Sequence, residues 1–361
     1  MAQKQPLIRI AKRDDRPFWQ KLLIKAIFIA LALVIAAVFI NSVTKLNPLA
    51  VYSSMFRGAF STPRRVWITV RDTFLLLAIA VGLTPAFKMK FWNTGAEGQM
   101  LVGGLATAAM MIYLGDKVPT ILLLVLMALV SALAGAIWGF FPAFFRAKFN
   151  TNETLFTLMM NYIGIQLVEF FVDIWDKKQS HSVGIINANT MGGWMPQIFG
   201  QQYLLIIIIV ALITAAVFVY IRYTKHGYEL SVIGESENTA RYAGINVPLV
   251  IVRTILVSGA ICGLAGFLEV AGISHTISNQ TAGGRGFTAI IVAWLAKLNP
   301  IVMVVYSFLI VFLKKGAVQI ASDFNLNEFA SNIITSILLF CILASDFFIN
   351  YQLIFRHKED R

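Results

Sequence analysis

Residues 226–247 read HGYELSVIGESENTARYAGINV, a polar stretch that separates two very apolar parts of the chain. Asn238 stands where a helix N-cap is expected, while Gly244, with Pro248 soon after it, is typical of a helix end. So short a helix is not stable alone in water, so the rest of the protein must hold it. We therefore expect a membrane bundle that presents this helix to one aqueous face, as a docking element.

The composition is typical of a polytopic helical membrane protein. Of the 361 residues, 58% are apolar and only 13% are charged, against roughly 45–50% and about 25% in soluble domains. Runs such as Leu204–Tyr220 (LLIIIIVALITAAVFVY) are long enough to cross a membrane and do not alternate as β-barrel strands do. We attribute the net charge of +12 to loops that face anionic membrane lipid and the cytoplasm, and expect no nucleic-acid partner.

The pattern of apolar segments predicts an all-α membrane protein with about ten spans, some of them broken or half-length. The predicted spans cover residues 22–41, 72–88, 94–114, 119–144, 154–175, 202–222, 249–273, 284–297, 300–318 and 330–350. Lys and Arg favour the segments that lie inside when both termini are cytoplasmic. Residues 45–71 break this bias, so they either fold back as an interfacial helix or shift the number of spans before them.

This topology divides the chain into three parts. Residues 1–21 form a basic cytoplasmic tail, residues 22–350 the transmembrane domain, and residues 351–361 a second cytoplasmic tail. Within the domain, residues 223–248 form a cytoplasmic loop and residues 176–201 an external one. The external loop is either a surface on which a partner docks or a simple connector.

Two predicted spans are irregular. Trp92–Gly104 (WNTGAEGQMLVGG) is rich in glycine and polar residues, and Gly283–Pro300 (GGRGFTAIIVAWLAKLNP) is short, with glycines at its start and a proline at its end. Backbone groups freed at such breaks are tolerated at membrane depth only where protein or a water-filled cavity covers them. A pair of irregular segments, one in each half of the chain, is typical of a transport path.

Polar residues in two spans are candidates for lining that path: Asn93, Glu97, Gln99, Thr157 and Asn161. An intramembrane carboxylate such as Glu97 is a functional hypothesis, although it could instead bind freed backbone at the break in its own helix. Asn93, four residues earlier, is expected on the same helical face. Thr157 and Asn161 share one side of the fifth span with Glu169, and either face the path or form hydrogen bonds between helices.

Other motifs have structural interpretations. Asn150 and Glu153 form a predicted capping box at the start of the fifth span. Gly259, Gly263 and Gly266 form a small-residue face that predicts close helix packing.

The sequence carries none of the common enzyme signatures. It has no phosphate-binding loop and no HExxH, Gly-x-Ser-x-Gly or Cys-x-x-Cys motif. Cys262 and Cys341 lie inside apolar spans, where we expect core residues, not a disulfide or metal pair. We expect no catalytic residue, no metal site and no cofactor bound by this chain.

Four segments resemble one family of proteins. FWNTGAEGQMLVGG (91–104) resembles the WNIGAEGQ signature of permease subunits of bacterial ABC importers for simple sugars and nucleosides, and VIGESENTARYAGINV (232–247) resembles their cytoplasmic loop. NETLFTLMMNYIG (152–164) and GGRGFTAIIVAWLAKLNP (283–300) also resemble motifs of this group. The resemblance extends over about residues 47–346 and is greatest to the larger, guanosine-type nucleoside permease.

This resemblance implies a multi-pass protein of the bacterial plasma (inner) membrane with a type II-like importer permease fold. It implies three partners: a cytoplasmic ABC ATPase that binds ATP and Mg²⁺, a second and distinct permease, and an extracellular substrate-binding lipoprotein. The residues that it assigns to ATPase coupling are Gly234, Glu235, Asn238, Ala240, Arg241, Gly244 and Ile245. Ser236-Glu237 replaces the usual Asn-Pro pair of the family, and Glu237 is expected to make the docking surface more acidic.

Other functions stay open at this point. A simple-sugar (ribose-like) ABC permease is the nearest alternative to a nucleoside permease. From another class, a proton-coupled secondary transporter would use Glu97 or Glu169 as a proton relay, but it gives no reason for a capped cytoplasmic helix. A scaffolding protein would leave the paired broken segments unexplained.

Overall fold

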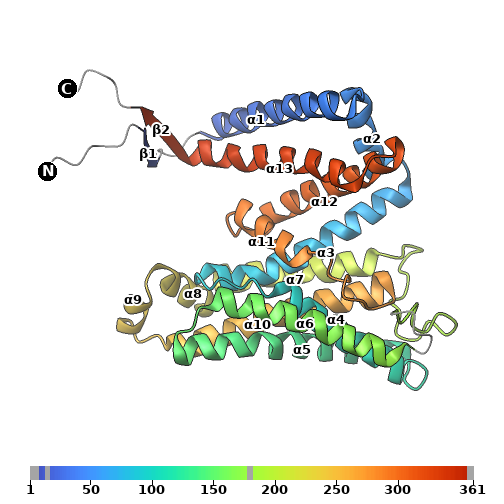
Figure 1. Ribbon diagram of the computed structural model, residues 1–361. Coiled ribbons are helices and arrows are strands. Elements are labelled where there is room, and N and C mark those ends of the chain that lie inside the picture. Colours follow the sequence, from blue (N-terminus) through green and yellow to red (C-terminus); the bar gives the residue numbers. More distant parts are fainter. Residues whose placement is uncertain (1–7, 13–16, 177–181, 356–361) are drawn as a thin grey trace. The chain divides into compact units, whose positions relative to one another are not determined.

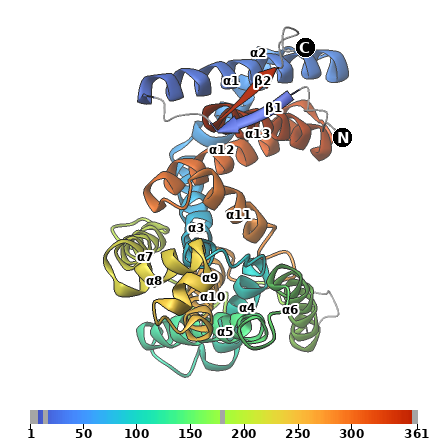
Figure 2. The same cartoon turned by 90° about the vertical axis from the view of Figure 1, so that its left-hand side faces the viewer.

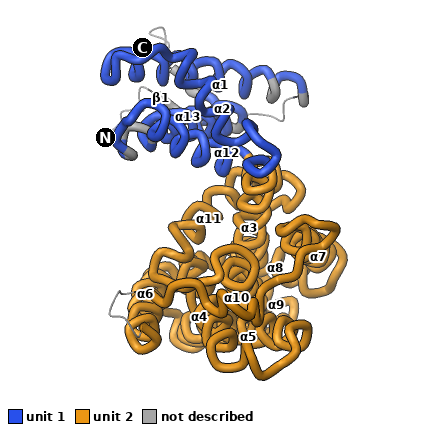
Figure 3. The backbone as a smooth tube through the Cα atoms, turned by 90° about the vertical axis from the view of Figure 1, so that its right-hand side faces the viewer, with its two compact units in different colours: residues 1–66, 309–361 blue, residues 67–308 orange. Residues whose placement is uncertain are grey.

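The computed structural model describes residues 8–12, 17–176 and 182–355. The chain forms two compact units, one of Met1–Val66 with Leu309–Arg361 and the other of Trp67–Phe308 (Figure 3). The division falls within two helices, α3 (Pro63–Lys88) and α12 (Pro300–Phe324).

Unit 1 brings helices from the first part of the chain together with helices from the last part. Besides the start of α3 and the end of α12, it contains β1 (Ile8–Lys12), α1 (Phe18–Phe39), the π-helix η1 (Ile40–Thr44), α2 (Pro48–Phe60), α13 (Glu328–Asn350) and β2 (Tyr351–Phe355). Helix α1 packs against α13, and β1 pairs antiparallel with β2, with Ile8 opposite Phe355 (Figure 1). The sequence analysis placed both strands in tails and did not foresee this pairing.

Unit 2 holds most of the helices. Besides the rest of α3 and the start of α12, it contains α4 (Ala96–Leu114), α5 (Thr120–Phe149), α6 (Glu153–Trp175), α7 (Leu204–Tyr223), α8 (Lys225–Glu235), α9 (Glu237–Tyr242), α10 (Val247–Glu269), the π-helix η2 (Val270–Ser274) and α11 (Arg285–Leu295). Its centre is α10, which packs against α4 and α5 (Figure 2).

The glycines of α10 explain how closely these three helices approach. A Cβ at Gly263 would lie 2.2 Å from the carbonyl oxygen of Ser131 in α5, and one at Gly266 would lie 2.1 Å from that of Met100 in α4. A Cβ at Gly259 would meet the Gly135 carbonyl oxygen at 2.4 Å. The backbones are therefore in direct contact, which confirms the close packing predicted for this face.

Eight helices of the described part are long and apolar enough to cross a membrane. The other two predicted spans correspond to α4, which carries Glu97 and Gln99 in its first turns, and to α11, which has only 11 residues where a span needs about 20. The prediction of an all-α polytopic membrane protein is confirmed. Cys262 and Cys341 are both buried and free, so neither forms a disulfide.

The stretch 45–71, which broke the charge bias, contains a helix that the predicted spans lack. Helix α2 begins at Pro48, and the side chain of Asn47 caps it by accepting from the Leu49 N–H at 2.9 Å. Helix α3 begins at Pro63, earlier than the predicted start at residue 72. Proline at the first helical position, with a capping Asn before it in α2, is the local signal for these starts.

The predicted capping box of Asn150 and Glu153 is wrong. Asn150 ends α5 in a left-handed conformation, with φ of 52°, which asparagine tolerates better than most residues. The N-cap of α6 is Asn152, whose side chain accepts from the Leu155 N–H at 3.1 Å.

The described part of the predicted external loop is anchored to the end of η2. Trp194 stacks on His275 with ring centroids 3.8 Å apart. The backbone N–H of Met195 donates to the Ala271 carbonyl at 3.0 Å, and that of Ile186 donates to the His275 carbonyl at 2.8 Å. Burial lowers the pKa of His275, which favours the neutral imidazole. Residues 177–181 of the predicted loop lie outside the described residues.

Candidate functional site

The polar stretch that opened the sequence analysis forms two short helices, and we call residues 225–244 the coupling element. Helix α8 begins directly after α7, and the chain passes so close to α7 at Gly227 that a Cβ there would lie 2.1 Å from the Ile221 carbonyl oxygen. Thr224 caps α8 by accepting from the Gly227 N–H at 3.2 Å, and its hydroxyl donates to the Tyr220 carbonyl at 2.6 Å. The element is thus fixed to the end of a predicted span.

The second helix, α9, begins earlier than predicted. Its N-cap is Ser236, whose side chain accepts from the Thr239 N–H at 3.3 Å, so the prediction of Asn238 as N-cap is wrong. Ser236 has the extended backbone of an N-cap, and Glu237 then lies in the first turn, where the helix dipole favours negative charge. Gly244 ends the helix with φ of +78°, as predicted.

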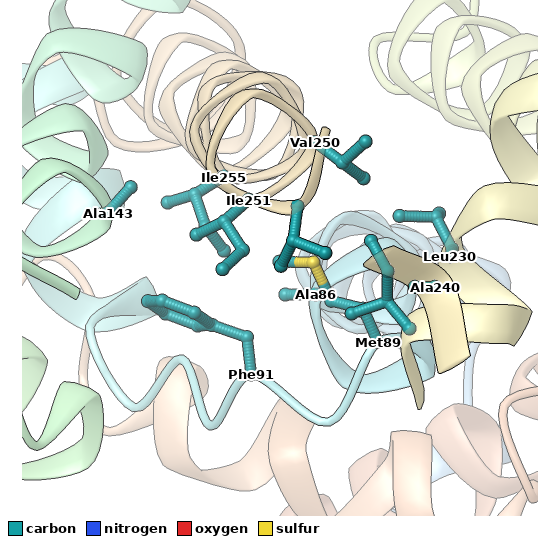
Figure 4. Packing of buried hydrophobic residues seen from close by; sticks show 11 residues of the cluster. Ala86, Met89, Phe91, Ala143, Leu230, Ala240, Val250, Ile251 and Ile255 are labelled. Carbon is teal, nitrogen blue, oxygen red and sulfur yellow. The ribbon is translucent and has the colours of Figure 1, made fainter. Parts of the chain in front are cut away.

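One side of the coupling element is buried against the transmembrane helices. Leu230 and Ala240 belong to an apolar cluster with Met89 and Phe91, which follow α3, and with Val250 of α10 (Figure 4). A Cβ at Gly234 would lie 2.2 Å from the carbonyl oxygen of Lys88, the last residue of α3. This packing supplies the support that such short helices require.

Ion pairs reinforce this seat at two points. Arg146 of α5 contacts Glu237 of α9 at 3.1 Å, and Arg253 of α10 contacts Glu229 of α8 at 2.7 Å. Glu237 also lies 3.8 Å from Arg241. Two arginines therefore lie close enough to balance the charge of Glu237, and its effect on docking stays a prediction.

The seven residues predicted to couple to an ATPase divide into two groups. Gly234, Ala240 and Ile245 pack inward and seat the element. The exposed members are Glu235, Asn238, Arg241 and Gly244. The coupling role of all seven stays a prediction.

The sequence analysis overlooked two aromatic residues on the exposed side of the coupling element. Tyr242 is 94% exposed, and Tyr228 is exposed as well. The available signal was an aromatic side chain inside a polar stretch, since Tyr is enriched at protein interfaces.

A second cluster of predicted site residues surrounds the break before α4. Residues 92–95 are not helical and α4 begins at Ala96, so the prediction that Asn93 and Glu97 share a helical face is wrong. Asn93 is fully buried; its side chain accepts from the Gly95 N–H at 3.0 Å and donates to Gln99 at 3.2 Å. The broken backbone is thus covered by protein, as membrane depth requires.

Helix α6 contributes the rest of this cover. The side chain of Asn161 donates to the Thr94 carbonyl and accepts from the Gly98 N–H, both at 2.8 Å. Thr157 accepts from the Thr94 N–H at 3.2 Å. Both residues therefore form hydrogen bonds between elements, which was the alternative to lining the path; a place on the path stays a prediction for Asn93, Glu97, Gln99, Thr157 and Asn161.

Glu97 joins the two irregular segments. It is only 6% exposed, and its carboxylate accepts from the Gly284 N–H at 2.7 Å and the Gly286 N–H at 2.6 Å. A Cβ at Gly286 would lie 2.4 Å from the Glu97 nitrogen, so the starts of α4 and α11 are in contact. The alternative interpretation was that Glu97 binds backbone groups freed at the break in its own helix. The backbone groups that it binds belong instead to the second irregular segment, at Gly284 and Gly286. One carboxylate thus lies where the positive ends of two helix dipoles meet.

The sequence analysis missed a second buried carboxylate beside this contact. Glu269 of α10 is buried and lies 3.5 Å from Arg285, the first residue of α11. Arg285 also donates to the Thr281 carbonyl at 2.9 Å. The signal was present, because a carboxylate inside an apolar span is expensive and is retained for a reason. Glu169, further along α6, accepts from Asn279 instead.

Comparisons with known proteins were made on the whole chain. The family model described as "Branched-chain amino acid transport system / permease component" matches residues 67–343. No solved structure matches the chain significantly.

Curated relatives cover most of the chain. The guanosine ABC transporter permease protein NupP of Bacillus subtilis (strain 168) is 32% identical over 81% of this chain and 85% of its own length. The nucleoside ABC transporter permease protein NupB of Lactococcus lactis subsp. cremoris (strain MG1363) is 27% identical over 77% and 79%. The glucose ABC transporter permease protein TsgB13 of Haloferax volcanii is 26% identical over 96% and 93%.

Proposed function

Because this chain belongs to the family of permease components of branched-chain amino acid transport systems, we propose that it is the membrane permease subunit of an ATP-driven importer for a nucleoside. A transport subunit of this kind is not itself an enzyme. Two of the relatives described above carry guanosine or nucleoside in their names, and this supports the choice of substrate. The glucose permease among them keeps a simple sugar as the second candidate.

The observation that carries the proposal is the way the coupling element packs against the transmembrane helices. Its buried side packs on the ends of α3 and α10, and ion pairs join it to α5 and α10. Its other side presents Arg241 and Tyr242 to solvent. An ATPase that binds the exposed side and moves would therefore displace the ends of three helices together, since packed elements shift as units.

The contact between α4 and α11 is the second part of the mechanism. Glu97 holds the start of α11 through two backbone N–H groups, and Arg285 pairs with Glu269 of α10. Displacement of α10 by the coupling element would reach this contact directly. We propose that the path for the solute opens and closes beside the contact between α4 and α11.

The proposal includes partners and an orientation. A cytoplasmic ABC ATPase would carry the ATP and Mg²⁺, a second permease would complete the path, and a substrate-binding lipoprotein would deliver the solute outside. The coupling element and both termini would face the cytoplasm of a bacterium, and the protein would lie in its plasma membrane. Residues 182–203 would then face the binding protein.

Uptake of labelled guanosine into membrane vesicles that contain the full importer tests this function. ATP-driven import predicts that vanadate abolishes uptake and that an uncoupler leaves it intact. The reverse pattern would favour the proton-coupled carrier. Parallel uptake of labelled ribose separates the two substrate classes, because a nucleoside importer accumulates guanosine and not ribose, whereas a sugar importer accumulates ribose and not guanosine.

A further inference from the structure

An apolar groove lies between the end of α5 and the start of α10, two helices that run side by side (Figures 1 and 2). It has a volume of about 840 Å³. The helices touch at Gly139, where a Cβ would lie 3.2 Å from Ile255, and the groove opens beyond that contact. Its walls are formed by Phe140, Phe144, Ala147, Lys148, Pro248, Leu249, Val252, Arg253, Leu256 and Val257.

Among the described residues that line the groove, only Lys148 and Arg253 are charged. Arg253 is paired with Glu229 at 2.7 Å. Lys148 is exposed near the end of α5, and its amine lies 5.6 Å from the rings of Phe144 and Phe149. Among the described residues, no carboxylate forms an ion pair with Lys148. The groove therefore combines an apolar floor with an unneutralised positive charge at one end.

The length of the groove matches one leaflet of a membrane. At about 1.5 Å per residue, α10 rises roughly 14 Å from Pro248 to Val257, which is close to half of a hydrocarbon core of about 30 Å. Lys148 lies at the end of α5, a helix long and apolar enough to cross a membrane, and lipid headgroups are expected at such a helix end. An apolar groove on a membrane-spanning bundle offers water no hydrogen bonds, whereas an acyl chain fits it.

We propose that this groove binds one anionic phospholipid, with an acyl chain between Phe140, Phe144 and Leu256 and the lipid phosphate against the Lys148 amine. Arg253 on the same wall is paired with Glu229, so Lys148 carries the net positive charge of the groove. In the proposed orientation the groove opens to the cytoplasmic leaflet, where anionic lipids are concentrated. The charge pattern thus selects the headgroup, while the apolar walls accept any acyl chain of ordinary length.

The site is connected to the coupling element. Arg253 lies on the groove wall and forms the ion pair with Glu229 of α8. A bound lipid would therefore support the α8 seat, and ATP-driven uptake would depend on anionic lipid. This consequence rests on the proposed function, whereas binding of the lipid does not.

Photolabelling in nanodiscs tests the site on the full chain. Phosphatidylglycerol and phosphatidylcholine that carry the same photoreactive acyl chain are compared, and labelled peptides are identified by mass spectrometry. We expect phosphatidylglycerol to label residues 140–148 and 248–257 several times more than phosphatidylcholine. Lys148→Gln should lower this excess about fivefold, since one lysine near a charged membrane surface contributes about 1 kcal/mol. Lys148→Arg should retain it, and Lys225→Gln, which removes an exposed cation outside the groove, should leave it unchanged.

Three results would overturn the proposal. Equal labelling by the two lipids, or labelling that Lys148→Gln does not change, would mean that only ordinary annular lipid lies there. Absence of lipid labelling in the assembled importer, together with cross-linking of Leu249→Cys to another subunit, would mean that protein covers the groove. Leu256→Trp, which fills the groove, should abolish the phosphatidylglycerol excess while the protein remains folded.

Discussion

A single buried carboxylate holds the starts of α4 and α11 together. Glu97 accepts hydrogen bonds from two backbone N–H groups at the start of α11. The sequence indicated that Glu97 matters, because it is charged and lies in an apolar segment. It could not indicate the partner, since Gly284 and Gly286 lie far away along the chain and contribute only backbone atoms.

Glu97→Gln should therefore destabilise the protein. The amide keeps one acceptor oxygen but places an NH₂ group against the second N–H donor. At least one buried charge-assisted hydrogen bond is therefore lost, which should lower the free energy of unfolding by about 2 kcal/mol. Thermal unfolding of the purified chain in detergent measures the effect. Glu235→Gln, at an exposed carboxylate, is the matched control and should change little. Equal stability of the two variants would contradict the role given to Glu97.

Arg241→Glu addresses the exposed side of the coupling element. Arg241 is exposed, and its recorded ion pair is the long one with Glu237 at 3.8 Å, so charge reversal should leave folding and membrane insertion intact. Reversal at a docking surface should lower ATP-driven uptake by roughly tenfold or more, because like charges are brought together at the interface. Uptake and ATP hydrolysis are measured together, with Lys117→Glu, at an exposed cation in the loop between α4 and α5, as the control reversal outside the coupling element. Normal transport by Arg241→Glu would remove the docking assignment.

Residue-level errors of the sequence analysis came from competing local signals. Asn238 and Ser236 are both good N-cap residues, and Ser236 forms the cap because Glu237 then occupies the first turn. Asn150 was assigned to a helix start, yet it ends the preceding helix in a left-handed conformation. Asparagine suits both positions, so residue type alone does not separate them.

At the scale of elements, the glycine face of α10 sets the packing of unit 2. The sequence predicted that this face packs closely but not against which helices. The structure shows α5 and α4 as its partners, through Gly135 and Gly103 among others. Pairing of helices depends on the whole bundle, so the spacing of glycines within one helix does not specify it.

Gly263→Ala tests this packing. An ordinary Gly→Ala change inside a helix stabilises by up to about 1 kcal/mol, whereas here the new methyl would meet the Ser131 carbonyl oxygen at 2.2 Å. We expect a net destabilisation of about 1–3 kcal/mol, seen as a lower thermal midpoint in detergent. Helix propensity alone would raise the thermal midpoint of this variant, whereas the steric contact should lower it. A raised midpoint would therefore contradict the close contact.

The sequence identified both irregular segments, but it did not predict that they contact each other. Low hydropathy and glycines marked the first, and short length with a terminal proline marked the second. That their starts meet is a contact between residues almost 190 positions apart, Glu97 and Gly286. Periodicity along the chain carries no information about such a contact.

At the scale of the whole molecule, the class of the protein follows from composition. Long apolar runs with few charges predicted a polytopic helical membrane protein, and the described part has eight helices that could span a membrane. The pairing of β1 with β2 was not predicted, because short terminal segments without clear alternation give no strand signal. Orientation in the membrane rests on the distribution of Lys and Arg and stays a prediction.

Labelling of single exposed cysteines tests this orientation. Asn238→Cys lies in the coupling element and Asn189→Cys in the predicted external loop, while Cys262 and Cys341 are buried. Because the native thiols are buried, they should react poorly with a membrane-impermeant maleimide. We expect that reagent to label Asn238→Cys only in inside-out vesicles and Asn189→Cys only in right-side-out vesicles. The reverse pattern would invert the topology.

The most direct test of the central claim is purification of the full chain from native membranes in mild detergent, followed by mass spectrometry of what accompanies it. Our account predicts that an ABC ATPase and a second permease copurify in stoichiometric amounts. A chain that purifies alone and still transports nucleoside when reconstituted would contradict it, and the coupling element would then have no ATPase to bind.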